Sequence, residues 1–175
     1  MGCGSSKPKQ AEAPKVVNED ASWKFSPSIK VEDKNIEQCR DNGTTACCIG
    51  KVPVTSIKVK LLPTQQFLFT GLMDMAIATT TPCTTAGIKG HEGVFGCPMQ
   101  ENTVVMNGSP THYKRSALRN CDVVEYKYEN DRIFFKIGTE WDLLYVVGTD
   151  KKFVFVCEMC HMHSRCEILE ITAAT

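Results

Sequence analysis

The first six residues, Met-Gly-Cys-Gly-Ser-Ser, carry the most clearly defined chemistry in this sequence. Removal of Met1 exposes the amine of Gly2, which accepts a myristoyl chain when Ser or Thr stands at position 6, as Ser6 does here. Cys3 lies beside it, and a thiol held close to a membrane accepts palmitate. We therefore expect Gly2 and Cys3 to be lipid-attachment residues that carry myristate and palmitate.

The energetics of anchoring favour the use of both positions. One myristoyl chain binds membranes with an affinity of only about 10⁴ M⁻¹, so stable anchoring needs a second signal. A polybasic patch does not supply it, because the three lysines within residues 1–20 are offset by three acidic residues. We expect a lipoprotein on the cytoplasmic face of a membrane, the plasma membrane first and a ciliary membrane as the alternative.

A Cys/His cluster at residues 157–166 is the second set of side chains that could do chemistry. Thiolates and imidazoles are ligands for tetrahedral zinc, and Cys157, Cys160, His163 and Cys166 would form such a site. Four ligands from one ten-residue hairpin make a tight arrangement, and buried thiols in apolar strands are the simpler interpretation. We expect no metal and no cofactor, and keep a zinc- or redox-responsive protein as an alternative function.

Catalysis and nucleic-acid binding are not favoured by the remaining side chains. The 10 cysteines and 4 histidines permit a Cys–His nucleophile, yet no signature of a thiol enzyme surrounds any of them. We assign no catalytic residue and expect no enzymatic activity. The 20 basic and 20 acidic residues balance, whereas nucleic-acid binding needs a surplus of positive charge.

The elements that position these residues are expected to be β-strands. The sequence holds 15 Val, 10 Ile and 16 Thr against 8 Leu and 10 Ala, and β-branched side chains favour strands over helices. Residues 57–61 and 123–128 alternate as half-buried strands do, and residues 67–73 are apolar on both faces, as in an inner strand. Further strands are expected at 35–39, 44–49, 93–96, 103–106, 132–137, 143–147, 153–157 and 166–171.

Two turns are expected to join neighbouring strands into hairpins. Residues 129–131 join 123–128 to 132–137, and Asp-Asn-Gly at 41–43 joins 35–39 to 44–49. About ten to twelve strands at this spacing indicate an all-β fold, a two-sheet antiparallel β-sandwich. We expect a flexible acylated tether at residues 1–20, a sandwich domain at 21–172 and a short tail at 173–175.

The order of these strands resembles the SPRY family of β-sandwich domains. Trp23 to Pro27 is similar to the entry strand of the family, and Phe67 to Met75, with its Gly71-Leu72 step, to its central strand. Gly93 to Gly96 followed by Asn107-Gly108 is similar to its aromatic strand and turn. The best match is Cys121 to Tyr126 with Asp131 to Phe135, and Phe153 to Val156 resembles the closing strand. Other concanavalin-type or galectin-like sandwiches are the alternative folds.

The resemblance implies a protein-interaction module without a catalytic centre, which binds a peptide or protein partner through loops at one end of the sandwich. Long connections are expected at 79–92, 97–102 and 107–120, with a shorter one at 138–142. Their large side chains are the candidate contact residues: His91, Met99, His112, Tyr113 and Trp141. A lectin-like carbohydrate-binding sandwich is a further alternative. The sequence does not indicate an oligomeric state.

Overall fold

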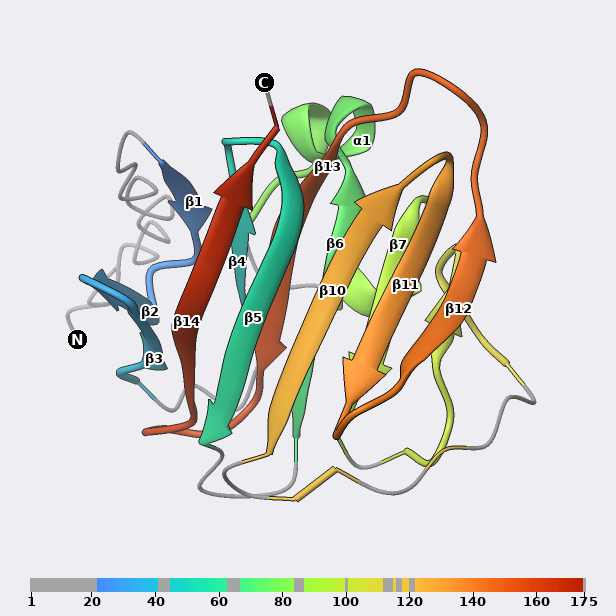
Figure 1. The fold of residues 1–175 in the computed structure, drawn as a ribbon. Helices are drawn as coiled ribbons and strands as arrows, with labels where there is room; N and C mark the ends of the chain where they lie inside the picture. Colours follow the sequence, from blue (N-terminus) through green and yellow to red (C-terminus); the bar gives the residue numbers. More distant parts are fainter. Residues whose placement is uncertain are drawn as a thin grey trace, which may run out of the picture.

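The protein folds into two seven-stranded antiparallel sheets packed face to face, as a computed structural model shows (Figure 1). The structure describes residues 22–40, 45–62, 67–83, 87–99, 101–111, 115, 118–119 and 122–174. The predicted all-β, two-sheet antiparallel sandwich is confirmed. Fourteen strands are present among the described residues, more than the ten to twelve expected.

Sheet I and sheet II are defined by the order of their strands. Sheet I runs β1 (Trp23–Phe25), β4 (Ala46–Gly50), β13 (Phe153–Met159), β6 (Leu68–Asp74), β7 (Val94–Pro98), β8 (Val105–Met106) and β9 (Ser109–Pro110). Sheet II runs β12 (Trp141–Val146), β11 (Arg132–Ile137), β10 (Val123–Glu129), β5 (Val54–Leu62), β14 (Arg165–Ala173), β3 (Asn35–Gln38) and β2 (Ile29–Glu32). Strands distant in sequence therefore meet in both sheets.

The inner strands β4, β13, β6 and β7 of sheet I are buried on both faces because two separate cores cover them. One face packs on sheet II, and this core between the sheets includes Leu72 and Phe155. The other face is covered by helix α1 (Met75–Thr80) and the 3₁₀ helix η1 (Ile88–Gly90), which enclose a second core that includes Phe69 and Val156. Every residue of β6 is consequently buried, and the prediction that residues 67–73 form an inner strand is confirmed.

Sheet II buries one face and leaves the other open to solvent. Along β5 and β10 buried residues alternate with half-buried ones, as the sequence pattern predicted. The β10–β11 hairpin is also confirmed, with Glu129 paired to Arg132. Its turn residues Asn130 and Asp131 have φ of 51° and 59°, a left-handed conformation that Asn and Asp adopt more readily than other side-chain-bearing residues.

A buried tyrosine ties the two sheets together. The hydroxyl of Tyr126 on β10 donates to the backbone carbonyl of Thr70 on β6 at 2.7 Å. It also lies 2.9 Å from Thr70 Oγ1. Burial raises the pKa of Tyr126 well above 10.0, which keeps the hydroxyl protonated and able to donate. β6 also pairs with β7, and Gly71 lies opposite Gly96 in this pairing. An added Cβ at Gly96 would lie 2.2 Å from the Thr70 carbonyl oxygen.

The predicted hairpin between residues 35–39 and 44–49 is wrong. β3 pairs with β2 and β14 in sheet II, whereas β4 pairs with β1 and β13 in sheet I. The chain therefore crosses from one sheet to the other between these strands, and the expected turn at 41–43 lies outside the described residues. β2, β9 and helix α1 were not predicted. β14 continues to Ala173, one residue beyond the expected end of the domain.

Helix α1 is short and is fixed at both ends by side chains. Asp74 caps its first turn, with Oδ1 accepting the Ala76 N–H at 3.0 Å. At its other end Lys24 Nζ donates to the carbonyls of Ala78 and Thr81 at 2.8 and 2.7 Å. In the part of the chain that the structure describes, neither this nor any other helix has the length and apolar character needed to cross a membrane.

Candidate functional site: the β12 edge

Of the loop residues expected to contact a partner, the three that the structure describes do not form one surface. Trp141 is 37% exposed, although it is the first residue of β12 and not part of a loop. His91 is half-buried in the turn after η1, where its carbonyl accepts the Val94 N–H. Met99 is 8% exposed and belongs to the core between the sheets, so we remove it from the candidate contacts. His112 and Tyr113 lie outside the described residues.

Strand β12 concentrates the exposed apolar side chains of the molecule. Seven large hydrophobic residues are exposed in the described ranges, and four of them lie on β12: Trp141 at 37%, Leu143 at 47%, Tyr145 at 38% and Val146 at 59%. β12 is the outermost strand of sheet II and, in the described part of the chain, pairs with β11 alone (Figure 1). One row of its backbone N–H and C=O groups therefore has no neighbouring strand.

The strand register places Trp141, Leu143 and Val146 on the solvent face of sheet II, together with Phe134 of β11. Trp141 pairs with Lys136, Leu143 with Phe134 and Val146 with Arg132, so each points to the same side as its partner. We call Phe134, Trp141, Leu143 and Val146 the β12 patch. The register shifts between Ile133 and Phe134, so Leu144 and Tyr145 both lie toward the inner face of sheet II, and Val146 returns to the solvent face.

Tyr145 faces the other way and connects β12 to sheet I. Its ring lies 5.0 Å from that of Phe95 on β7, a tilted aromatic contact that fixes the edge of sheet II against sheet I. The bulge therefore separates two roles along one strand. Leu144 and Tyr145 hold β12 to the body of the protein, and the residues of the β12 patch face solvent.

Two lysines flank the aromatic part of the β12 patch. Nζ of Lys136 lies 4.7 Å from the centre of the Trp141 ring, and Nζ of Lys127 lies 5.2 Å from it. Each ammonium also pairs with a carboxylate, Lys136 with Glu125 at 2.6 Å and Lys127 with Glu129 at 2.8 Å. The charges of these two lysines are thus balanced locally by carboxylates, whereas Arg132 lies beside Val146 on the same face.

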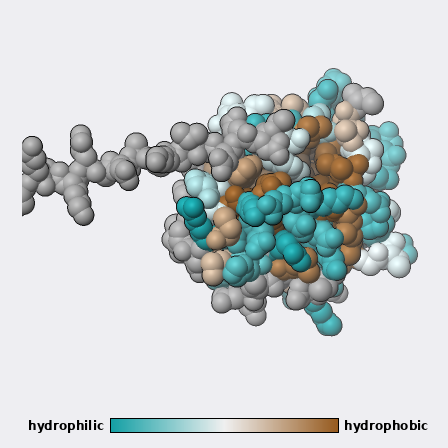
Figure 2. All heavy atoms as spheres, turned by 90° about the vertical axis from the view of Figure 1, so that its left-hand side faces the viewer, coloured by the Kyte–Doolittle hydropathy of each residue, from teal (hydrophilic) through white to brown (hydrophobic). Residues whose placement is uncertain are grey.

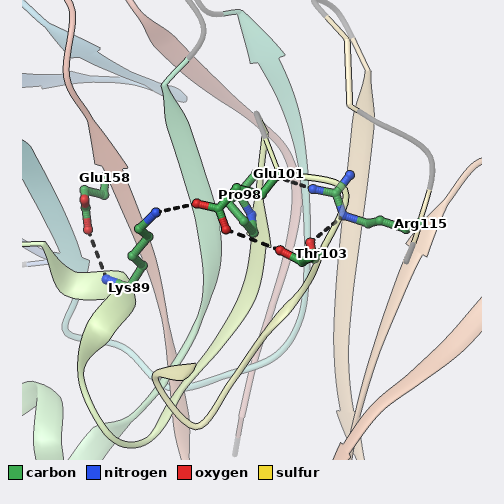
Figure 3. Close-up of polar contacts among 6 residues, drawn as sticks. All are labelled: Lys89, Pro98, Glu101, Thr103, Arg115 and Glu158. Atoms are coloured by element: carbon green, nitrogen blue, oxygen red, sulfur yellow. Dashed lines mark hydrogen bonds and ion pairs between the residues drawn. The ribbon is translucent and has the colours of Figure 1, made fainter. Parts of the chain in front are cut away.

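The loops beside β7 are held by a separate network of polar contacts (Figure 3). Lys89 Nζ pairs with Glu101 Oε1 at 2.8 Å, while its backbone N–H donates to Glu158 Oε2 at 3.0 Å. Arg115 donates from Nε to the Thr103 carbonyl at 3.1 Å and from its guanidinium to the Pro98 carbonyl. The sequence showed no sign of this network, because its members are spread from residue 89 to residue 158.

The pKa values of two carboxylates in this network are shifted in opposite directions. The hydrogen bond from Lys89 lowers the pKa of Glu101, whereas burial raises the pKa of Glu158. Both carboxylates are engaged by protein groups, and the network fastens η1 to the 98–103 segment. The network therefore has a structural role, which is to hold these loops in place.

The Cys/His cluster at 157–166 is not assembled as a metal site. Cys157 and Cys166 are buried in the core between the sheets, on β13 and β14, and Cys160 is half-buried. His163 is exposed, and its Nδ1 lies 3.1 Å from Glu37 Oε1. Across the described ranges, no three His, Cys, Asp or Glu side chains gather where they could hold a metal ion. The zinc alternative therefore has no support from the geometry.

Comparison with known proteins places the fold. No protein-family model and no curated protein matches this sequence. Among solved structures the chain is similar to a human SPRY domain, with a TM-score of 0.65 and 11% identity over 85% of this chain and 96% of that one. The SPRY domain of human HERC1 is similar with a TM-score of 0.62 and 12% identity, over 82% of this chain and 96% of that one.

The likeness extends to a domain solved with a sugar. The exoplasmic/lumenal domain of VIP36, in its Ca²⁺/Man3GlcNAc-bound form, has a TM-score of 0.52 and 12% identity over 87% of this chain and 82% of that one. Identities this low show the fold alone. The chain has a SPRY-type β-sandwich fold, as its strand order predicted.

Proposed function

We propose that this chain is a membrane-tethered protein-interaction module. Acyl chains on Gly2 and Cys3 hold it at the cytoplasmic face of a membrane, and strand β12 binds an extended segment of a partner protein. One observation carries the binding half of this proposal: four of the seven exposed large hydrophobic side chains in the described ranges lie on one edge strand.

A peptide strand added to β12 would contact both its edge backbone groups and its exposed side chains. A peptide that lies along β12 satisfies the unpaired backbone groups, and its alternate side chains contact the β12 patch. Trp141 and Phe134 supply rigid aromatic surface, and aromatic residues carry much of the binding energy at protein interfaces. Because Lys127 and Lys136 are already paired with carboxylates, apolar side chains select the peptide more than charge does.

The SPRY-type fold supports a binding role over a catalytic one. Such a sandwich offers a rigid body with loops and edges on which contacts can be displayed. Two described carboxylates near the loops, Glu101 and Glu158, are held by protein groups. The most exposed apolar surface, in contrast, is shaped for contact with another chain.

The tether supports binding through local concentration. Confining the sandwich to a membrane surface raises its effective concentration for partners on the same surface. The sequence evidence is Gly2, Cys3 and Ser6, together with the absence of a net basic patch within residues 1–20. We expect Gly2→Ala to abolish incorporation of a myristate analogue in eukaryotic cells, and Cys3→Ser to shift the protein from the membrane fraction while the myristate label stays. Equal labelling of the Gly2→Ala chain would end this half of the proposal.

The binding surface is tested by proximity labelling and pull-down with the intact chain. The variant Leu143→Lys/Val146→Lys places two charges on the β12 patch at exposed positions, where folding tolerates them. Met162→Lys is the control that adds one positive charge at an exposed apolar position outside the β12 patch, since Met162 is 42% exposed at the turn before β14. Partners that the β12 patch binds are lost from the double variant and kept by the control. Identical partner sets for all three chains would refute the assignment of the binding surface. Glycan binding on an array that is unchanged in the double variant would instead support the lectin alternative.

A further inference from the structure

The side of the sandwich opposite to β12 holds a second apolar feature, a cavity of about 510 Å³. It lies between β1 and β4 of sheet I and β14 of sheet II. Figure 2 looks at this side and shows hydrophobic surface exposed among hydrophilic side chains. The buried floor is formed by Phe155, Val54 and Ile168. The cavity is therefore an opening into the core between the sheets.

The strand register shows why this side of the core stays open. Ile171 pairs with Ile57 and Ala173 with Val54, so both point to the inner face of sheet II. Inner-face residues are normally buried, yet Ile171 is 50% exposed, and Val52 across the cavity is 44% exposed. These apolar side chains line a space that nothing in the described part of the chain fills.

One wall of the cavity is built where the described chain begins. Ser22 and Trp23 both line it, and the Trp23 ring packs edge-on against Phe155 with 6.3 Å between ring centres. Gly50 lies behind that ring, and an added Cβ there would come within 3.4 Å of it. The cavity therefore opens at the point where residues 1–21 join the sandwich.

We propose that this cavity binds the acyl chain attached to Gly2 when the protein is off the membrane. The lining suits an unbranched hydrocarbon, because its floor and walls are apolar and its charged members, Asp33, Lys34 and Glu170, are exposed. Gly2 lies twenty positions before Ser22, a stretch that spans at most about 66–72 Å when extended and gives ample length to return. Binding within one chain also profits from a high effective concentration. The proposal rests on the acylation of Gly2 proposed above.

Occupation of the cavity competes with insertion into lipid. A single myristoyl chain binds membranes only marginally, so an intramolecular cavity can hold it in place of the bilayer. A second chain on Cys3 has no equal place in a cavity of this size, and its addition favours the membrane. Acylation of Cys3 would thus convert a protein that binds its own acyl chain into one that stays at the membrane.

The experiment uses the full chain, myristoylated by an N-myristoyltransferase and without palmitate. Mass spectrometry first establishes whether Gly2 is acylated; an unmodified chain defeats the tether proposal and this one with it. Trp141→Phe then leaves Trp23 as the only tryptophan, since the sequence holds 2. We expect Trp23 emission to shift to shorter wavelength on myristoylation. Identical spectra with and without the acyl chain would overturn the cavity proposal alone.

A second measurement separates docking of the acyl chain from a general change at the N-terminus. Ile171→Glu places a carboxylate at the cavity mouth, at a position exposed enough to keep the fold, and Met162→Glu is the matched control. We expect the acylated Ile171→Glu chain to bind phosphatidylcholine vesicles about tenfold more tightly, a ratio equal to about 1.4 kcal/mol. The control should match the unsubstituted chain. Equal vesicle binding by all three acylated chains would contradict the proposal, as would an Ile171→Glu effect that persists in unacylated protein.

Discussion

Replacement of Tyr126 by Phe tests the contact that joins the two sheets. The substitution removes one oxygen from a side chain that is fully buried and leaves the ring in place. It deletes the hydrogen bond donated to the Thr70 carbonyl at 2.7 Å and the contact with Thr70 Oγ1 at 2.9 Å. No large cavity is created, so the effect reports on the polar contacts themselves.

The expected loss follows from the number of bonds removed. A neutral hydrogen bond contributes about 1 kcal/mol to stability, and a buried polar group left without its partner costs about 1–3 kcal/mol. For Tyr126→Phe we expect the free energy of unfolding to fall by about 2 kcal/mol. In a domain of this size that corresponds to a decrease in Tm of about 4–8 °C.

Tyr128→Phe is the control on the same strand. The hydroxyl of Tyr128 is half-buried and lies 3.3 Å from Asp131 Oδ1 at the exposed turn, so water replaces this contact when it is lost. We expect less than about 0.5 kcal/mol for this variant. Urea unfolding followed by circular dichroism measures both, and an unchanged slope with urea shows that the unfolded state is not altered.

A double-mutant cycle with Thr70→Val assigns the loss to the pair. Valine keeps the backbone carbonyl of residue 70 and removes its hydroxyl. Because Thr70 and Tyr126 share a contact, the double variant should lose less than the sum of the two single variants, by about 0.5–1 kcal/mol. The reasoning fails if Tyr126→Phe loses no more stability than Tyr128→Phe, or if the two substitutions at the pair are additive.

Three further predictions follow from burial. Of the eight described cysteines, Cys39 and Cys160 should be alkylated first in the folded protein, because the other six are buried; peptide mapping by mass spectrometry measures the order, and early alkylation of any other described cysteine would contradict it. Gly96→Ala should destabilise the protein by at least about 3 kcal/mol or prevent folding, since its Cβ would meet the backbone oxygen of Thr70; an unaltered urea midpoint would count against this packing. Burial raises the pKa of Glu158 above 4.5, so the folded state binds this proton more tightly than the unfolded state does, and the resulting stability is lost as the pH rises through the raised pKa. Glu158→Gln should therefore gain stability relative to the unsubstituted chain as the pH rises above 4.5, and a stability difference that stays constant with pH would contradict the raised pKa.

The sequence predicted the strands well wherever burial gives a simple pattern. Alternation located β5 and β10, and the continuous apolar run located β6. Local patterns could not assign strands to sheets. The Asp-Asn-Gly turn at 41–43 suits a hairpin, but β3 pairs with β14 and β4 with β13, both more than 100 residues later in the chain. Long-range pairing prevailed over the local turn signal.

The candidate site shows the same limit on a smaller scale. Trp141 was identified from its residue type, and residues 143–147 were identified as a strand. Their joint exposure depends on the register shift between Ile133 and Phe134, because it leaves both Leu144 and Tyr145 on the inner side and returns Val146 to the solvent face beside Arg132. It also depends on the place of β12 at the edge of sheet II. Neither property is encoded within the segment itself.

The two proposed sites lie on opposite sides of the sandwich, and this arrangement has a consequence for their coupling. The described chain begins at Ser22 beside the cavity, whereas the β12 patch lies at the far edge of sheet II (Figure 1). A membrane attached through the N-terminus thus need not cover the β12 patch. None of the described residues that line the cavity lies on β11 or β12, so we expect filling or emptying it to leave the register of the β12 patch unchanged. Under the two proposals, acylation would set where the protein is and β12 would set what it binds, as two separable properties of one domain.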